Sequence, residues 1–141
     1  MKIERPKVGV NVFVIKDNKL LLGKGKNVFG DGYWGLPGGH LEGGESMTGG
    51  AKRELKEETG LTADKLTFLN VINDPPIDEG GHYVHVGFLA EDVQGEPRLT
   101  EPDKCSELKW FDLNDLPQEE EIFIGHRKQI AAFLNKIVFV D

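Results

Sequence analysis

The sequence predicts an α/β fold in which a mixed β-sheet lies between helices. Segments that alternate apolar and polar residues precede and follow a central segment with helical periodicity, and a second helical segment comes near the end of the chain. This order favours helical layers packed on one sheet. A chain of 141 residues is expected to form a single domain over residues 1–141.

The first part of the chain predicts a β-hairpin followed by two loops. Val8–Lys16 has the alternation of a strand, Asp17–Asn18 has turn residues, and Lys19–Gly23 can return as a second strand. Lys24–Tyr33 is polar and contains glycine, so we expect a loop there. A glycine-rich loop is expected over Pro37–Gly44.

The second part of the chain predicts three more strands and a closing helix. The predicted strands are Leu66–Ile72, Tyr83–Leu89 and Leu108–Phe111. We expect a charged loop over Glu91–Glu107. The last helix is predicted over about Gly125–Lys136, because its apolar residues recur at helical spacing.

The central helix is predicted from Ser46 to Thr59. Ser46 is a good N-cap residue, and Gly60 suits the C′ position that follows a helix. The N-cap places the free amides and the positive end of the helix dipole near the glycine-rich loop. This arrangement favours anions such as phosphates.

Three glutamates on this helix indicate a metal site. Glu54, Glu57 and Glu58 stand at i, i+3 and i+4, where like charges repel and destabilise a helix. The cost is explained if a cation lies between them. Hard divalent cations such as Mg²⁺ take carboxylate oxygens and complete their shell with water and substrate phosphates. The sequence therefore predicts a metal-dependent enzyme that acts on phosphates.

The direction of these glutamates supports the prediction. Met47, Ala51 and Leu55 define the apolar side of the helix, and Glu54 and Glu58 fall within the same arc. A solvated helix with Glu/Lys pairs is the ordinary alternative, but it leaves these two inward carboxylates unexplained.

Arg53 is expected to hold one of the carboxylates. It precedes Glu57 by four residues, so a charge-assisted hydrogen bond can join the two side chains on one face of the helix.

The segment Gly39–Leu61 resembles the Nudix box. In that motif a glycine is followed after five residues by Glu, and after seven more by Arg-Glu-(aliphatic)-x-Glu-Glu-x-Gly-(aliphatic). All nine specified positions match: Gly39, Glu45, Arg53, Glu54, Leu55, Glu57, Glu58, Gly60 and Leu61. A departure is the pair Gly49–Gly50 inside the helix, which costs on the order of 1–2 kcal/mol relative to alanine. Close packing of Gly50 against the sheet would explain it.

Resemblance to Nudix hydrolases implies an α/β/α sandwich and cleavage of a nucleoside diphosphate linked to another moiety. It implies that Glu54, Glu57 and Glu58 are catalytic together with Arg53, and that the three glutamates bind Mg²⁺ or Mn²⁺ with the Gly39 carbonyl as a further ligand. Glu45 belongs to the box, but a structural role, capping amides or orienting Arg53, remains open.

A general base outside the box is not fixed by the sequence. Glu101 and Asp103 lie in a loop that can reach the site, and Glu79 is a weaker candidate. For each of them a solvated loop charge is the more common role. His82 and His85 stand at i, i+3 in a strand and therefore point to opposite faces, which argues against a metal pair.

Four stretches outside the central motif resemble the MutT-type branch: Gly38–Glu42, His82–Val84, Glu101–Cys105 and Trp110–Leu113. This resemblance implies hydrolysis of a nucleoside triphosphate, oxidised or modified ones included, to a monophosphate and pyrophosphate. The alternatives are a Nudix hydrolase of ADP-ribose or a nucleotide sugar, and a Nudix-fold nucleotide-binding module without turnover. The expected substrate-binding residues are Gly38, His40, Tyr33, Trp34, Gly125 and His126. For Tyr33 and Trp34 a place in the core is the competing interpretation.

Composition limits the partners. The formal net charge of −7 argues against long nucleic acid, whereas a small phosphate substrate remains compatible once cations bind. No stretch approaches the length of a membrane span. The single cysteine, Cys105, fits a reducing compartment, so a cytoplasmic protein is expected. The MutT-type resemblance also makes a homodimer possible.

Overall fold

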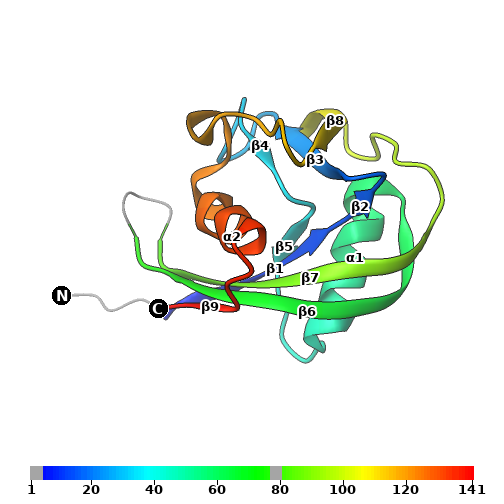
Figure 1. The fold of residues 1–141 in the computed structure, drawn as a ribbon. Coiled ribbons are helices and arrows are strands. Elements are labelled where there is room, and N and C mark those ends of the chain that lie inside the picture. Colours follow the sequence, from blue (N-terminus) through cyan, green and yellow to red (C-terminus); the bar gives the residue numbers. More distant parts are fainter. Residues whose placement is uncertain (1–4, 77–80) are drawn as a thin grey trace.

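The structure is a computed structural model that describes residues 5–76 and 81–141. Its main element is a five-stranded mixed sheet with the strand order β5-β1-β7-β6-β9 (Figure 1). These strands are β1 (Lys7–Phe13), β5 (Gly38–His40), β6 (Thr62–Asp74), β7 (Tyr83–Gln94) and β9 (Phe139–Val140). β1 runs parallel to β7 and antiparallel to β5, while β6 is antiparallel to β7. The predicted mixed sheet is therefore confirmed.

A second sheet of four strands packs beside the first. It contains β2 (Ile15–Lys16), β3 (Lys19–Gly25), β4 (Trp34–Gly35) and β8 (Cys105–Asp112), with β3 paired to each of the others. The predicted hairpin is present, and Asp17 and Asn18 both have positive φ in its two-residue turn. The predicted strand Val8–Lys16 is divided at Val14, because its two parts pair in different sheets.

Two helices cover opposite faces of the five-stranded sheet (Figure 1). Ala51 and Leu55 of α1 (Met47–Thr59) pack in one core cluster with Val10 and Val12 of β1. Phe13, on the other face of β1, packs with α2 (Ile124–Leu134). Successive side chains of β1 therefore pack alternately against the α1 layer and the α2 layer, as an α/β/α sandwich requires.

The boundaries of α1 follow its sequence signals. The Ser46 side chain accepts a hydrogen bond from the Gly49 amide at 3.0 Å, and Gly60 has the left-handed conformation of a C′ residue. The predicted final helix, Gly125–Lys136, is observed as Ile124–Leu134, preceded by a short 3₁₀ turn at Glu119–Glu121. None of the helices in the described ranges is both long enough and apolar enough to cross a membrane.

The β6–β7 hairpin is longer than predicted. Its pairing extends from Asp74 and Tyr83 to Thr62 and Gln94. The added parts of the two strands are mostly polar. They place only Ala63, Ala90 and Val93 in or against the core, which is too little apolar alternation to reveal them.

Candidate active site

The end of the sheet at β5 lies against the acidic face of α1. The Gly38 amide donates a hydrogen bond to Glu58 Oε1 at 2.7 Å. A Cβ atom at Gly39 would lie 2.5 Å from the Glu54 carboxylate. Glycine at this position therefore lets the carboxylate of α1 approach the backbone of β5, where the Gly39 carbonyl is also found.

Arg53 joins this helix to the loop before it. Its Nε and Nη2 atoms donate to both carboxylate oxygens of Glu45, at 3.1 and 2.8 Å. Its Nη1 atom donates to Glu54 at 2.8 Å and to Glu57 at 3.3 Å, and Nη2 also reaches the His40 carbonyl at 3.2 Å. The expected contact with Glu57 is present, but the shortest hydrogen bonds go to Glu45 and Glu54.

Glu45 connects the loop before α1 to the helix through its hydrogen bonds. Besides its two hydrogen bonds with Arg53, its Oε1 atom accepts from the Glu42 amide at 2.8 Å. These hydrogen bonds lower the pKa of the Glu45 carboxyl to about 2. A Cβ at Gly50 would stand 2.8 Å from the same carboxylate. Gly50 therefore makes room for Glu45 within the helix–loop junction, rather than for the sheet as expected.

Partial burial raises the pKa values of the two inward glutamates, Glu54 and Glu58. Glu58 is half-buried beneath β5. Desolvation, together with the charges of Glu54, Glu101 and Glu57, raises the pKa of its carboxyl to about 8 despite the Gly38 hydrogen bond. Burial also raises the pKa of Glu54, whose side chain is 15% exposed. Glu57 is 54% exposed and faces outward. The predicted inward direction of Glu54 and Glu58 is confirmed.

The residues present fit a hard divalent cation. The described part of the chain contains no group of three His, Cys, Asp or Glu side chains already placed to hold a metal ion. Glu54 is instead turned to Arg53 and Glu58 to the Gly38 amide. The half-buried carboxylates of Glu54 and Glu58 repel each other beside a glycine backbone. They supply oxygen ligands, and a cation there would offset their mutual repulsion.

The loop between β7 and β8 reaches this cluster. The Thr100 hydroxyl donates to the Glu57 carbonyl, and the charge of Glu101 raises the pKa values of Glu54 and Glu58. Glu101 also pairs with Lys104 at 3.5 Å. Of the base candidates, Glu101 is therefore electrostatically coupled to the cluster, whereas Glu79 lies outside the described residues.

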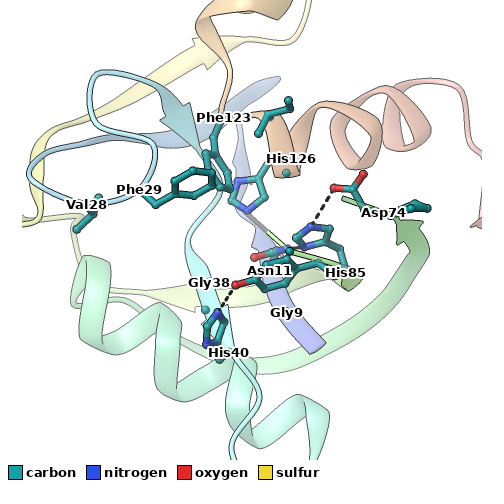
Figure 2. Close-up of a pocket in the computed structure, with 16 residues that line it drawn as sticks. Gly9, Asn11, Val28, Phe29, Gly38, His40, Asp74, His85, Phe123 and His126 are labelled. Carbon is teal, nitrogen blue, oxygen red and sulfur yellow. Dashed lines mark hydrogen bonds and ion pairs between the residues drawn. The ribbon is translucent and has the colours of Figure 1, made fainter. Parts of the chain in front are cut away.

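A cavity of about 390 Å³ is lined in part by Gly38 and His40 of β5 (Figure 2). The same strand contacts Glu54 and Glu58 of α1. Four of the predicted substrate-binding residues line it: Gly38, His40, Gly125 and His126. Tyr33 lines a smaller neighbouring cavity of about 180 Å³ instead. Trp34 is buried in the core, where its ring meets Phe111 edge to face at 4.9 Å.

Other lining residues were not among the expected substrate-binding residues. The polar ones are Asn11, Asp74 and His85, and the aromatic ones are Phe29, Tyr83 and Phe123. Asn11 left one signal, a polar residue in the middle of an apolar strand. The remaining residues come from segments far apart in the sequence, and no local pattern indicates that they meet.

The two histidines of the cavity are neutral donors or acceptors rather than charges. Burial lowers the pKa of His85, an effect that nearby Asp74 partly opposes. Burial and the neighbouring His85 lower the pKa of His126 to about 3. His126 Nδ1 accepts a hydrogen bond from the Leu36 amide at 3.0 Å. His82 lies just before β7 rather than in the strand, and its Nε2 atom is hydrogen-bonded to Asn73 Oδ1 at 2.6 Å.

Comparisons with known proteins agree with this geometry. The family model described as NUDIX domain matches residues 5–133. An ADP-ribose pyrophosphatase of Methanocaldococcus jannaschii is 38% identical over 129 residues, covering 92% of this chain and 73% of that protein. An oxidized purine nucleoside triphosphate hydrolase of Danio rerio is 38% identical over 107 residues, covering 75% of this chain and 66% of that protein.

A solved structure has the same arrangement of elements. The crystal structure of a MutT NUDIX hydrolase from Burkholderia pseudomallei superposes with a TM-score of 0.83 at 36% identity, covering 91% of this chain and 98% of that one. The fold, the acidic helix against a glycine strand and these similarities lead to one assignment. The chain belongs to the Nudix hydrolase family, as a MutT-like pyrophosphohydrolase.

Proposed function

We propose that the enzyme hydrolyses a nucleoside triphosphate to a monophosphate and pyrophosphate in a Mg²⁺-dependent reaction. One observation carries the proposal. The strand Gly38–His40 has the acidic face of α1 on one side and lines the 390 Å³ cavity on the other. A nucleoside in the cavity would therefore hold its phosphates beside the carboxylates.

The half-buried carboxylates of Glu54 and Glu58 and the exposed carboxylate of Glu57 would hold the cation, with the Gly39 carbonyl beside them. The cation would supply charge neutralisation and polarisation of the phosphoryl group. Arg53 fixes the position of Glu54 and of the loop through Glu45. Mn²⁺ can replace Mg²⁺ in an oxygen-only site of this kind.

Glu101 is the base that we propose for the attacking water. Its charge acts on both Glu54 and Glu58, and its loop is tied to α1 through Thr100. A carboxylate held beside the metal ligands can orient a water molecule and accept its proton.

ADP-ribose is the second candidate substrate. The relative from Methanocaldococcus jannaschii, named as an ADP-ribose pyrophosphatase, matches 92% of this chain. Both a nucleoside triphosphate and ADP-ribose contain a nucleoside, which we place in the 390 Å³ cavity. The two candidate substrates differ in the linkage that is cleaved. The linkage cleaved must be found by product analysis.

The test is product analysis with a panel of canonical and oxidised nucleoside triphosphates, ADP-ribose and nucleotide sugars, with Mg²⁺, with Mn²⁺ and with a chelator. We expect a monophosphate and pyrophosphate from a triphosphate, lost with the chelator and reduced by orders of magnitude in Glu58→Gln. Glu96→Gln, which changes an exposed carboxylate of the β7–β8 loop, is the matched control. Turnover of only ADP-ribose or a sugar nucleotide would refute the triphosphate assignment.

Homodimerisation and a small-molecule nucleotide as the main partner remain predictions. Sedimentation of the purified enzyme with and without nucleotide tests the first directly. A monomer under both conditions would contradict it.

A further inference from the structure

The C-terminal end of α1 is capped by a segment of the β7–β8 loop. A helix leaves its last four carbonyl groups without partners inside the helix. Here the Thr59 carbonyl accepts a hydrogen bond from the Arg98 amide at 3.0 Å, and the Glu57 carbonyl accepts one from the Thr100 hydroxyl. The segment Arg98–Thr100 is therefore an external cap for the helix that carries the proposed metal ligands.

The side chain of Arg98 lies over the same helix end. Gly60 has a left-handed φ of 76°, and a Cβ atom there would lie 3.2 Å from the guanidinium carbon of Arg98. Glycine thus leaves room for a cation beside the C-terminal carbonyls of α1, where positive charge is favourable. Both the backbone and the side chains of Arg98 and Thr100 contribute to this attachment.

Glu101 follows the cap directly and begins a tight turn. Its carbonyl accepts hydrogen bonds from the amides of Lys104 and Cys105, both at 2.9 Å. Cys105 is the first residue of β8, which pairs with β3 in the second sheet. The backbone of Glu101 is therefore held between the end of α1 and the start of β8.

The far side of this turn is attached to the β3–β4 loop. The Lys26 amide donates to the Lys104 carbonyl at 2.9 Å. Asn27 Nδ2 lies 3.5 Å from the Asp103 carbonyl oxygen, at the outer limit of a hydrogen bond. Neither contact involves Thr100, so loss of the Thr100 hydroxyl would loosen the turn only on the side of α1.

The backbone anchors decide where the Glu101 carboxylate lies. The carboxylate is close enough to the acidic cluster for its charge to raise the pKa values of Glu54 and Glu58. Its ion pair with Lys104 Nζ is 3.5 Å long, and the two side chains are 35% and 60% exposed. An exposed ion pair of this kind does little to fix a side chain.

We propose that Thr100 is a positioning residue, whose hydroxyl holds the Glu101 carboxylate beside the metal ligands by capping α1 at Glu57. Glu57 takes part at both of its ends, since its carboxylate is a proposed metal ligand and its carbonyl accepts from Thr100. The proposed base and a proposed ligand are thus anchored at one residue. This inference rests on the proposed hydrolytic function with Glu101 as its base.

The kinetic test compares two substitutions of Thr100 with a matched control. Thr100→Val keeps the shape of the side chain but loses the hydroxyl, and it should lower kcat by about tenfold with KM nearly unchanged. Thr100→Ser retains the hydroxyl and should keep most of kcat. Thr67→Val removes a hydroxyl that donates to Glu91 at 2.8 Å in the β6–β7 hairpin, and it should leave kcat unchanged.

A double-mutant cycle shows whether the hydroxyl acts through Glu101. The Glu101→Gln enzyme has already lost the base, so adding Thr100→Val should lower kcat by less than about twofold more. A further tenfold loss in that background, on the order of the loss in the unmodified enzyme, would overturn the proposal. So would an unchanged kcat in Thr100→Val, or a Thr100→Ser enzyme that is equally slow.

Hydrogen exchange tests the anchor without any substrate. The amides of Lys104 and Cys105 donate to the Glu101 carbonyl, so their exchange rates report the opening of the turn. Thr100→Val should speed their exchange by about fivefold, as the loss of one net hydrogen bond does, whereas Thr67→Val should not. Unchanged exchange in Thr100→Val would overturn the proposal.

These experiments separate the role of Thr100 from the proposed function. If Glu101→Gln keeps the kcat of the unmodified enzyme, the base assignment is refuted, and the role of Thr100 with it. A slow Glu101→Gln enzyme beside an unaffected Thr100→Val enzyme would refute the role of Thr100 alone. If no nucleotide is turned over, hydrolysis is refuted, and the exchange rates still decide whether the Thr100 hydroxyl holds this segment.

Discussion

Arg53 and Glu45 form a two-hydrogen-bond ion pair that ties α1 to the loop before it, with N–O distances of 3.1 and 2.8 Å. The same guanidinium reaches Glu54 at 2.8 Å. A planar guanidinium holds a carboxylate in a fixed orientation, which a lysine cannot do. The ion pair therefore positions one proposed metal ligand from a residue that does not bind metal itself.

The Arg53–Glu45 pair predicts an acid-sensitive stability. The pKa of Glu45 is lowered to about 2 in the folded protein from 4.5, so the unfolded chain binds its proton more tightly. The stabilisation is fully present above about pH 4.5 and is lost as the pH falls toward 2. Urea unfolding of the enzyme and of Glu45→Gln from pH 2 to 6 should show midpoints that differ at pH 6 and converge near pH 2. Equal midpoints at pH 6 would contradict the role of this pair.

The raised pKa of Glu58 predicts that the stability of the metal-free enzyme falls as the pH rises, opposite to the effect of Glu45. Its pKa is raised to about 8 in the folded state from 4.5, so folding favours the protonated form. Stability should fall by up to a few kcal/mol as the pH rises from about 4.5 to 8. Glu58→Gln cannot ionise and should lose most of this dependence. Thermal unfolding in chelator measures both proteins, and Mg²⁺ should restore stability at pH 8 only to the unmodified enzyme. A pH dependence that persists in the variant would contradict the assignment.

The close approach of Gly39 to Glu54 allows the proposed metal site to be tested by adding a methyl group at Gly39. A Cβ there would lie 2.5 Å from the Glu54 carboxylate, so Gly39→Ala must displace that side chain. We expect metal affinity and kcat to fall by at least about tenfold, as ligand misplacement does in other enzymes. Gly43→Ala adds the same methyl group where nothing lies within 4 Å, and it is the matched control. Isothermal titration with Mn²⁺ and steady-state kinetics measure the two effects. Equal behaviour of the two variants would show that Glu54 need not approach β5.

The proposed role of Glu101 as a base predicts that its substitution lowers kcat without changing KM. If it accepts the proton of the attacking water, Glu101→Gln should lower kcat by about a hundredfold or more while leaving KM nearly unchanged. Glu107→Gln, in β8, changes an exposed carboxylate farther along the same chain segment and should be neutral. A change in KM alone would assign Glu101 to substrate binding instead.

The acidic helix is the part of the site that the sequence predicts best. Its cap residues, its apolar stripe and the inward direction of Glu54 and Glu58 all follow from a period that is local to the chain. For Glu45 the sequence leaves open a structural role, capping amides or orienting Arg53, and the structure brings its carboxylate to both Arg53 and the Glu42 amide. The pair Gly49–Gly50 is explained only by the tertiary structure. A Cβ at Gly49 would lie 2.8 Å from the Ser46 hydroxyl, and a Cβ at Gly50 would lie 2.8 Å from the Glu45 carboxylate.

The sequence by itself determined the α/β order of the elements, the Nudix helix and the residue types that can hold a cation. These properties depend on spacing within one segment, where helical and strand periods place side chains predictably. Only the tertiary structure decided that Asn11, Asp74 and His85 meet at one cavity, and that Trp34 fills the core while Phe29 faces the cavity. Those contacts join strands that are distant in the chain, and sheet register and packing set them rather than any local pattern.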